Sequence, residues 1–455
     1  MRRPLVLALL CVRCVGVSEE AVPTAADAQT AVVDSGLGPL DAAVSSMPDA
    51  STVVRDAGAH DAGIVQPPDA GAIEVVARAD LEVHFPPPAS ATSEAQVLVH
   101  GSTRSGLTVT SVQVHGLTAS SSDQFRTWQV TVPLTVGANS LVVDFTESGV
   151  QHAAAATISI ERFADESSLA RGSGTWAGRI LGLAWDALGS RVILSDDVED
   201  GVWGVSVASG NRTILSDSEG DLVGAGYAIV QPRSGVVIGT TSYIVDDTLI
   251  VGIDLVSGDR AIVATAPGAL NDLSLSPNGV ELIAASLDLK AVLAIAPTTG
   301  QSRVISSAAV GSGPGPGNVG PLGVSASRHS AYVGLRYQDT LLAIDLETGN
   351  RRVFSEAIGG EPKLSDPEFV VVVEATGTAF VWDTARLVSV DLATGRRAVV
   401  AAASMAWAKG IHAMTSTPYG VALIDYVPSW EPPPHRAPTL LIVDPMSGGR
   451  VVLSR

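Results

Sequence analysis

The sequence predicts an all-β protein, and three observations support this expectation. Hydrophobic residues make up 46% and charged residues only 16% of the chain, with 45 glycines and 26 prolines, which suits short strands and tight turns better than a helical bundle. Apolar and polar residues alternate from about Arg78 to Phe163, as in half-buried strands. One hairpin pattern then occurs six times between Glu166 and Arg455. We therefore expect a six-bladed β-propeller at 166–455 and a small β-sandwich at 78–163.

The repeated hairpin consists of an apolar strand, a tight turn, and a second strand that starts near an arginine. Its turn glycines are Gly210, Gly258, Gly300, Gly349, Gly395 and Gly448, which lie 42–53 residues apart. Most copies have Asp-x-x-[Ser/Thr]-Gly, in which the side chain accepts hydrogen bonds within a type I turn and the glycine takes the left-handed conformation. Two more short strands precede each copy, for example Ile180–Trp185 and Arg191–Leu194. Four strands per repeat indicate propeller blades, whereas the coils of an open β-solenoid are usually shorter than about 30 residues.

The blade motif also resembles a known group of proteins. Asp345–Arg351 and Asp391–Arg397 both read Asp-Leu-x-Thr-Gly-x-Arg, and Asn278-Gly279 marks another turn. This pattern resembles six- and seven-bladed secreted bacterial propellers of the NHL-like, TolB-like and SMP-30/gluconolactonase-like groups. The resemblance implies how the blades are built and carries over no catalytic residue.

The preceding region has the strand spacing of a sandwich. Five strands are predicted at Ala95–Gly101, Leu107–His115, Thr127–Pro133, Ser140–Thr146 and Ala154–Glu161. The segment from Trp128 to Val143 resembles the second half of bacterial immunoglobulin-like modules, which usually space or support a neighbouring domain. We expect Trp128 to be a core residue. The histidines of this region, His84, His100, His115 and His152, share no metal-ligand spacing and are expected on the surface or in turns.

The N-terminus predicts export. A basic start and a short apolar run to Leu10 indicate a signal peptide at 1–17, too short to span a membrane. A lipid anchor through Cys11 or Cys14 and plain secretion both stay open. Residues 18–77 are rich in Ala, Asp and Pro and predict a disordered linker, because they offer little apolar surface to bury. This linker resembles the Asp-Ala-Gly-rich spacers of myxobacterial surface lipoproteins, which implies an address at the outer-membrane surface, in the periplasm or outside the cell.

The charge excludes two classes of partner. The formal net charge is −19, which argues against nucleic acid because binding a phosphate backbone requires a basic patch. The chain has only three lysines, Lys290, Lys363 and Lys409, so a polybasic surface for acidic lipids is not expected either.

Four aspartates suggest a cation site in the propeller channel. Asp196, Asp288, Asp383 and Asp425 follow the predicted second strands of their blades, so a ring could gather their oxygens around Ca²⁺. The alternative is that each aspartate caps the turn into the next strand. We favour the alternative, because Thr241 and Tyr337 stand at this place in two other blades.

A long loop provides the second candidate site. Residues 427–438 hold an aromatic side chain among prolines, and we expect Asp425, Tyr426, Trp430 and His435 to form a ligand-binding site. The sequence contains neither a Gly-x-Ser-x-Gly nor a His-Glu-x-x-His motif, and no cofactor is expected. The favoured function is therefore non-catalytic binding of a protein, peptide or glycan by an exported propeller. The alternative is a metal-dependent hydrolase or lactonase of the SMP-30/gluconolactonase-like kind.

Overall fold

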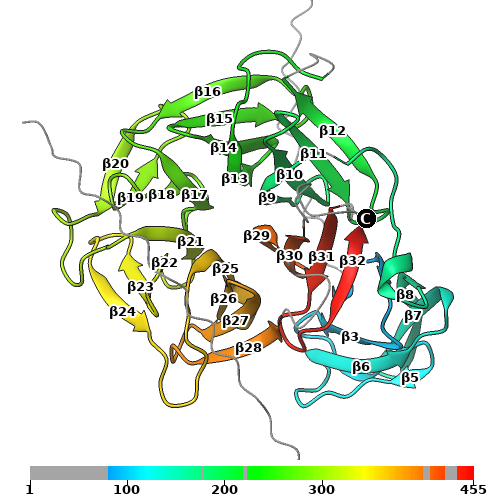
Figure 1. The fold of residues 1–455 in the computed structure, drawn as a ribbon. Helices are drawn as coiled ribbons and strands as arrows, with labels where there is room; N and C mark the ends of the chain where they lie inside the picture. Colours follow the sequence, from blue (N-terminus) through cyan, green and yellow to red (C-terminus); the bar gives the residue numbers. More distant parts are fainter. Residues whose placement is uncertain (1–79, 177, 219–222, 403–409, 426–437) are drawn as a thin grey trace, which may run out of the picture. The chain divides into compact units, whose positions relative to one another are not determined.

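The computed structural model describes residues 80–176, 178–218, 223–402, 410–425 and 438–455. Its six four-stranded antiparallel arrays are arranged in a ring, and these are the predicted blades (Figure 1). In each blade the first strand lies innermost and the fourth lies outermost. The only helical elements in the described residues are two short 3-10 turns, Glu166–Ser168 and Glu374–Thr376. The protein is therefore an all-β propeller protein, as the sequence predicts.

Each blade consists of consecutive strands. Blade 1 contains β9 (Ile180–Asp186), β10 (Arg191–Asp196), β11 (Gly201–Ser206) and β12 (Arg212–Asp217), and blade 2 contains β13 (Pro232–Ile238), β14 (Thr241–Asp246), β15 (Leu249–Asp254) and β16 (Arg260–Thr265). Blade 3 contains β17 (Leu270–Leu275), β18 (Leu282–Ser286), β19 (Ala291–Ile295) and β20 (Ser302–Ser306), and blade 4 contains β21 (Val319–Ser325), β22 (Ser330–Leu335), β23 (Leu341–Asp345) and β24 (Arg351–Ser355). Blade 5 contains β25 (Pro367–Val373), β26 (Thr378–Asp383), β27 (Arg386–Asp391) and β28 (Arg397–Ala402), and blade 6 contains β29 (Ile411–Thr417), β30 (Gly420–Asp425), β31 (Thr439–Val443) and β32 (Arg450–Ser454).

The turn between the third and fourth strands has the predicted geometry. In blade 4, Asp345 Oδ1 accepts the backbone N–H groups of Glu347 at 3.1 Å and Thr348 at 2.7 Å. The glycine that ends this turn, Gly349, has φ +73°, a conformation that glycine adopts without steric cost. The five equivalent glycines all have φ between 70° and 82°.

The arginine two residues after most turn glycines joins neighbouring blades. In blade 4, Arg351 Nη1 donates to Ser306 Oγ at 2.7 Å, and this serine lies on the outermost strand of blade 3. The same hydroxyl donates to the carbonyl oxygen of Gly349 at 2.7 Å. We call this Arg–Ser–Gly arrangement the inter-blade latch. Its members are Arg351 with Ser306, Arg260 with Ser216, Arg397 with Ser355, and Arg212 with Ser454.

Blades 3 and 6 depart from the latch in different ways. Blade 3 has Ser302 where the others have arginine, and the facing position on blade 2 is Ala264 instead of serine. Blade 6 keeps Arg450, but the facing residue of blade 5 is Ala401 in the sequence. Arg450 instead forms an ion pair with Glu166, which lies ahead of blade 1. Where the serine is missing, the chain therefore lacks the arginine or gives it another partner.

The ring closes between blades 6 and 1 without exchange of a strand, because both blades are built from consecutive strands. Arg212 Nη1 donates to Ser454 Oγ at 2.6 Å across this boundary. The backbone of Arg455 also donates to the carbonyl of Arg171 at 2.9 Å. Side chains of both blades, such as Ile180 and Ile442, share one hydrophobic core cluster. Latch and packing therefore hold the closure together.

Residues 81–162 form two packed sheets ahead of the propeller. One sheet contains β1 (Leu81–Phe85), β3 (Gln96–Thr103) and β6 (Thr127–Pro133). The other sheet contains β2 (Ala89–Thr92), β4 (Val109–Val114), β5 (Leu117–Thr118), β7 (Gly137–Glu147) and β8 (Val150–Arg162). Trp128 is 2% exposed in the core, as expected.

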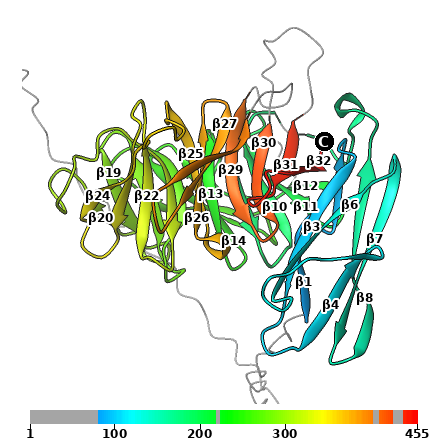
Figure 2. The same ribbon diagram turned by 90° about the horizontal axis from the view of Figure 1, so that it is seen from below.

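The second sheet continues into blade 6. Strand β2 pairs in parallel with β8, and on its other side Ala91 pairs antiparallel with Val452 of β32. Figure 2 shows β3 and β6 beside β32.

The expectation that the histidines lie on the surface or in turns is wrong for His100, because it is 7% exposed within β3. Its Nε2 lies 2.9 Å from Oδ1 of Asp444, in the last hairpin turn of the propeller.

Replacement of the latch serine Ser306 with alanine should lower the free energy of unfolding by about 1–3 kcal/mol. The change leaves the buried Arg351 guanidinium and the Gly349 carbonyl each short of one partner. Urea unfolding of the full chain measures this loss. The matched control is Ser302→Ala, an exposed serine on the same strand, for which we expect a change within about 0.5 kcal/mol. Equal effects of the two substitutions would contradict a role for the latch.

Candidate binding site in the central channel

The inner strands of all six blades line one cavity of about 1000 Å³ along the axis of the ring. Its walls are formed by β9, β13, β17, β21, β25 and β29, which are the innermost strands in Figure 1. A cavity of this volume is at the upper end of the range for small-molecule sites. The channel is therefore the main candidate for a binding site in the described residues.

Every inner strand contains an irregularity near its start. The register against the second strand skips one or two residues in each blade, at Leu181, Ser234, Asn271, Gly320 with Pro321, Glu368 and His412. Each blade contributes at least one of these residues to the cavity wall. A β-bulge redirects the side chain of its extra residue, and bulges are frequent beside functional sites. Six bulges at one level thus form a ring of side chains around the channel.

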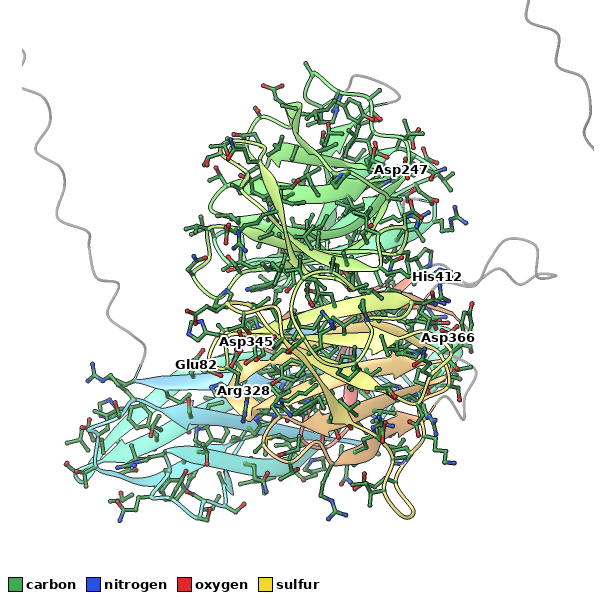
Figure 3. All side chains as sticks on the ribbon, turned by 90° about the vertical axis from the view of Figure 1, so that its left-hand side faces the viewer. Glu82, Asp247, Arg328, Asp345, Asp366 and His412 are labelled. Atoms are coloured by element: carbon green, nitrogen blue, oxygen red, sulfur yellow. The ribbon has the colours of Figure 1, made fainter. Side chains whose placement is uncertain are left out.

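This ring lies towards one face of the propeller. Figure 3 shows His412 on the same side as Asp247 and Asp366, whereas Arg328 and Asp345 lie on the opposite side. We call the side with Asp247, Asp366 and His412 the entry face. It carries the starts of the inner strands and the turns between second and third strands.

Two charged residues at this level have no partner among the residues that the structure describes. Arg233 precedes the bulge of β13 and is exposed, and Glu368 is the bulged residue of β25 and is partly buried. Within the described part of the chain, neither side chain makes a hydrogen bond or ion pair, and the same is true of the Asn271 amide. These groups are available to a ligand in the channel.

The pKa of Glu368 is raised from 4.5 to about 7. Burial is the main cause, because it penalises the charged carboxylate, and the nearby Asp366 and Asp383 raise the pKa further. Arg336 opposes this effect, but its guanidinium is already paired with Asp366 at 3.1 Å. Glu368 therefore changes charge near neutral pH.

Asp272 is a second carboxylate of the channel wall, and it has a structural role. Burial raises its pKa to about 6, and hydrogen bonds to the charged form oppose the shift. Ser234 of blade 2 donates to Oδ1, as does the backbone N–H of Leu273 at 2.8 Å. The backbone N–H of Leu322 in blade 4 donates to Oδ2 at 2.7 Å. Asp272 thus joins three adjacent blades below the ring of bulges.

On the opposite side of the ring, His412 lies near a paired arginine. Burial lowers the pKa of His412, and the positive charge of Arg179 lowers it further. Arg179 itself forms an ion pair with Asp197. The imidazole therefore favours its neutral form, which can both donate and accept a hydrogen bond.

Asp196 and Asp383, two of the aspartates predicted as cation ligands, have structural contacts: Asp196 caps the turn into the next strand, whereas Asp383 binds backbone groups ahead of β25. Oδ1 of Asp196 accepts two backbone N–H groups of the following turn, at 2.7 and 3.0 Å. Oδ1 of Asp383 likewise accepts two backbone N–H groups that precede β25, at 2.7 and 2.8 Å. Its Oδ2 pairs with Arg386 at 2.9 Å. The two aspartates lie on different blades, each at the end of the second strand.

The other two predicted ligands are not brought together with them. Asp288 is exposed, and the structural equivalent of Asp196 in its blade is Ser286. Asp425 is buried at the end of β30. In the residues that the structure describes, no group of three or more His, Cys, Asp or Glu side chains could hold a metal ion.

The predicted loop site is only partly within the structure. Asp425 is described, whereas Tyr426, Trp430 and His435 lie outside the described residues. Arg233, Asn271 and Glu368 were not predicted as site residues. Each is the second residue of an inner strand, and that position is the signal that could have identified them.

Comparison with known proteins gives structural neighbours only. No protein family model matches the chain, and no curated protein matches it. A protein of unknown function from Bacteroides thetaiotaomicron is 14% identical, with 77% of this chain and 96% of that chain covered and a TM-score of 0.44. An auxiliary nutrient binding protein from the same organism is 11% identical, with 76% and 94% covered and a TM-score of 0.44. Regucalcin from Agrobacterium tumefaciens, a calcium-binding protein, is 13% identical, with 63% and 95% covered and a TM-score of 0.44.

These comparisons assign neither a family nor a function to the chain. Within the described residues, no helix has the length and hydrophobicity needed to cross a membrane.

Replacement of Glu368 with glutamine should stabilise the protein at pH 8 and leave its stability unchanged near pH 4. The pKa of Glu368 is about 7 in the folded state, above its ordinary 4.5, so the fold loses stability as the pH rises through this window. Glutamine removes this loss, which we expect to be about 1–2 kcal/mol after allowance for partial exposure. Urea unfolding of the full chain at both pH values measures it. The control is Glu347→Gln, which changes an exposed turn residue. If Glu368→Gln changed the stability equally at both pH values, the raised pKa of Glu368 would be refuted.

Proposed function

We propose that this chain is an exported, non-catalytic binding protein whose peptide, protein or glycan ligand enters the central channel from the entry face. The observation that carries the proposal is the ring of six bulges around one cavity. It directs side chains from separate blades towards a common space, and it leaves Arg233, Asn271 and Glu368 without partners in the described structure. Polar groups that converge on a preformed cavity are typical of ligand sites.

The channel groups support binding better than proton transfer. The hydroxyl–carboxylate pair of Ser234 and Asp272 is occupied by contacts between blades, because both carboxylate oxygens accept hydrogen bonds. Ser234 Oγ also accepts the backbone N–H of Leu273 at 3.2 Å. Export is inferred from the signal-like start of the sequence and the acidic linker.

The alternative function is a metal-dependent hydrolase or lactonase with Ca²⁺ in the channel. No contact among the described residues favours it. The Oδ1 atoms expected to bind the ion accept backbone N–H groups, from the following turn in Asp196 and from the segment ahead of β25 in Asp383. We therefore do not derive a reaction for this chain.

Obstruction of the channel tests the proposal. The thermal midpoint of the full chain is measured with oligopeptides, free amino acids, monosaccharides and oligosaccharides, each with the wild type and with Asn271→Trp, which fills the cavity wall. A ligand present at about 100 times its dissociation constant adds about 2.7 kcal/mol, enough for a readable rise in the midpoint. We expect one ligand class to raise the midpoint of the wild type and to have no effect on Asn271→Trp.

The control is Val256→Trp, in which the same side chain is placed on an exposed turn of blade 2. This variant should respond as the wild type does. Recovery of the ligand unchanged, checked by mass spectrometry, is expected for a non-catalytic protein. An equal response of Asn271→Trp and wild type, or no response to any class, would argue against a channel site.

A further inference from the structure

Arg233 and Glu368, which have no partner in the described part of the chain, carry charges of opposite sign. Arg233 carries a positive charge on blade 2, and Glu368 carries a negative charge on blade 5 when ionised. Blades 3 and 4 separate them on one side of the ring, and blades 6 and 1 separate them on the other (Figure 1). The two residues therefore belong to opposing blades, at the same level of the channel.

The other charged groups near this level are already neutralised by the protein. Arg179 pairs with Asp197, and Arg336 pairs with Asp366. The Asp272 carboxylate accepts three hydrogen bonds. Among the described residues at this level of the channel, Arg233 and Glu368 thus remain without a partner.

Aromatic platforms for a sugar ring are scarce in the cavity. Among its described lining residues, Trp185 and Phe369 are the large aromatic side chains. Phe369 packs against a core cluster, and Trp185 is at the end of β9 away from the entry face, where it contacts Tyr419 edge to face. Among the described residues of the six bulges none is a large aromatic, so we favour a charged ligand over a glycan.

We propose that the channel binds a zwitterionic ligand of the peptide class, with its carboxylate at Arg233 and its ammonium group at Glu368. This inference rests on the proposed function and narrows it to one ligand class. A guanidinium can bind a carboxylate through two parallel hydrogen bonds, and a carboxylate accepts from an ammonium group. The amide of Asn271 can donate to and accept from the peptide groups between the two ends. The charged neighbours of Glu368 are Arg336, Asp366 and Asp383, of which Arg336 is held by Asp366, and the neutral form of His412 lies on the adjacent inner strand.

The test uses oligoglycines of increasing length as probes. Calorimetric titration of the full chain with glycine, diglycine, triglycine and tetraglycine identifies the length that spans the site. The best of these is compared with its N-acetylated form, which lacks the ammonium group, and with its C-terminal amide, which lacks the carboxylate. We expect each capped form to bind at least 10-fold more weakly than the free peptide.

Two variants assign the ends of the ligand. Arg233→Ala should abolish the preference for the free carboxylate and keep the preference for the free amine. Glu368→Gln should do the reverse. Arg303→Ala and Glu347→Gln, which change exposed residues away from the channel, should keep both preferences. Loss of a preference in the wrong variant, or in a control, would overturn the proposed orientation.

Equal binding of free and capped peptides, or no binding of any oligoglycine, would overturn the inference itself. The panel with Asn271→Trp then decides the broader proposal. If a saccharide raises the midpoint of the wild type and this effect is lost in Asn271→Trp, the channel is a binding site for another ligand class. If no class does so, both proposals fail.

Discussion

The structure depends on the contact by which the arginine of one blade reaches the outermost strand of the blade before it. A four-stranded blade cannot cover both of its faces, so each blade is stable only against its neighbours. At four of the six boundaries the arginine guanidinium donates to the serine hydroxyl, which donates in turn to the turn carbonyl. At the closing boundary, Arg212 and Ser454 are 242 residues apart in sequence. Closure of such a long loop costs entropy, and the latch with its apolar surroundings offsets part of that cost.

The same closing strand also joins the sandwich to the propeller. Strand β32 carries Ser454, which contacts blade 1, and Val452, which pairs with Ala91 of β2. Without β2 this strand would present an open sheet edge, which is prone to pairing with other chains. The His100–Asp444 contact adds a buried polar link at the final turn. Hydrogen bonds from His100 and Ser447 keep the pKa of Asp444 low although burial favours the neutral acid. Sandwich and ring closure are therefore coupled through a few residues.

The number and construction of the blades could be predicted from the sequence because both depend on local chemistry. The Asp-x-x-[Ser/Thr]-Gly turns and the strand alternation are encoded within about eight residues, and the glycines have the expected positive φ. The role of Arg351 could not be predicted, since its partner Ser306 is 45 residues away and is recognised only when the blades are side by side. The channel residues were missed for a similar reason. Glu368 is a bulged residue because the register of β25 against β26 shifts at this point, and alternation within one strand does not encode that shift.

Arg233 and Glu368 differ from several other charged residues of the described structure, which have partners. The chain pairs Arg336 with Asp366, redirects Arg450 to Glu166 where the latch serine is missing, and supplies three donors to Asp272. Glu368 is partly buried and forms no hydrogen bond or ion pair with the described residues, and the cost of this burial appears as its raised pKa. Perturbed pKa values of this kind cluster at functional sites. A ligand that brings a positive group to Glu368 favours the charged carboxylate, so part of the free energy that burial costs is recovered as binding affinity.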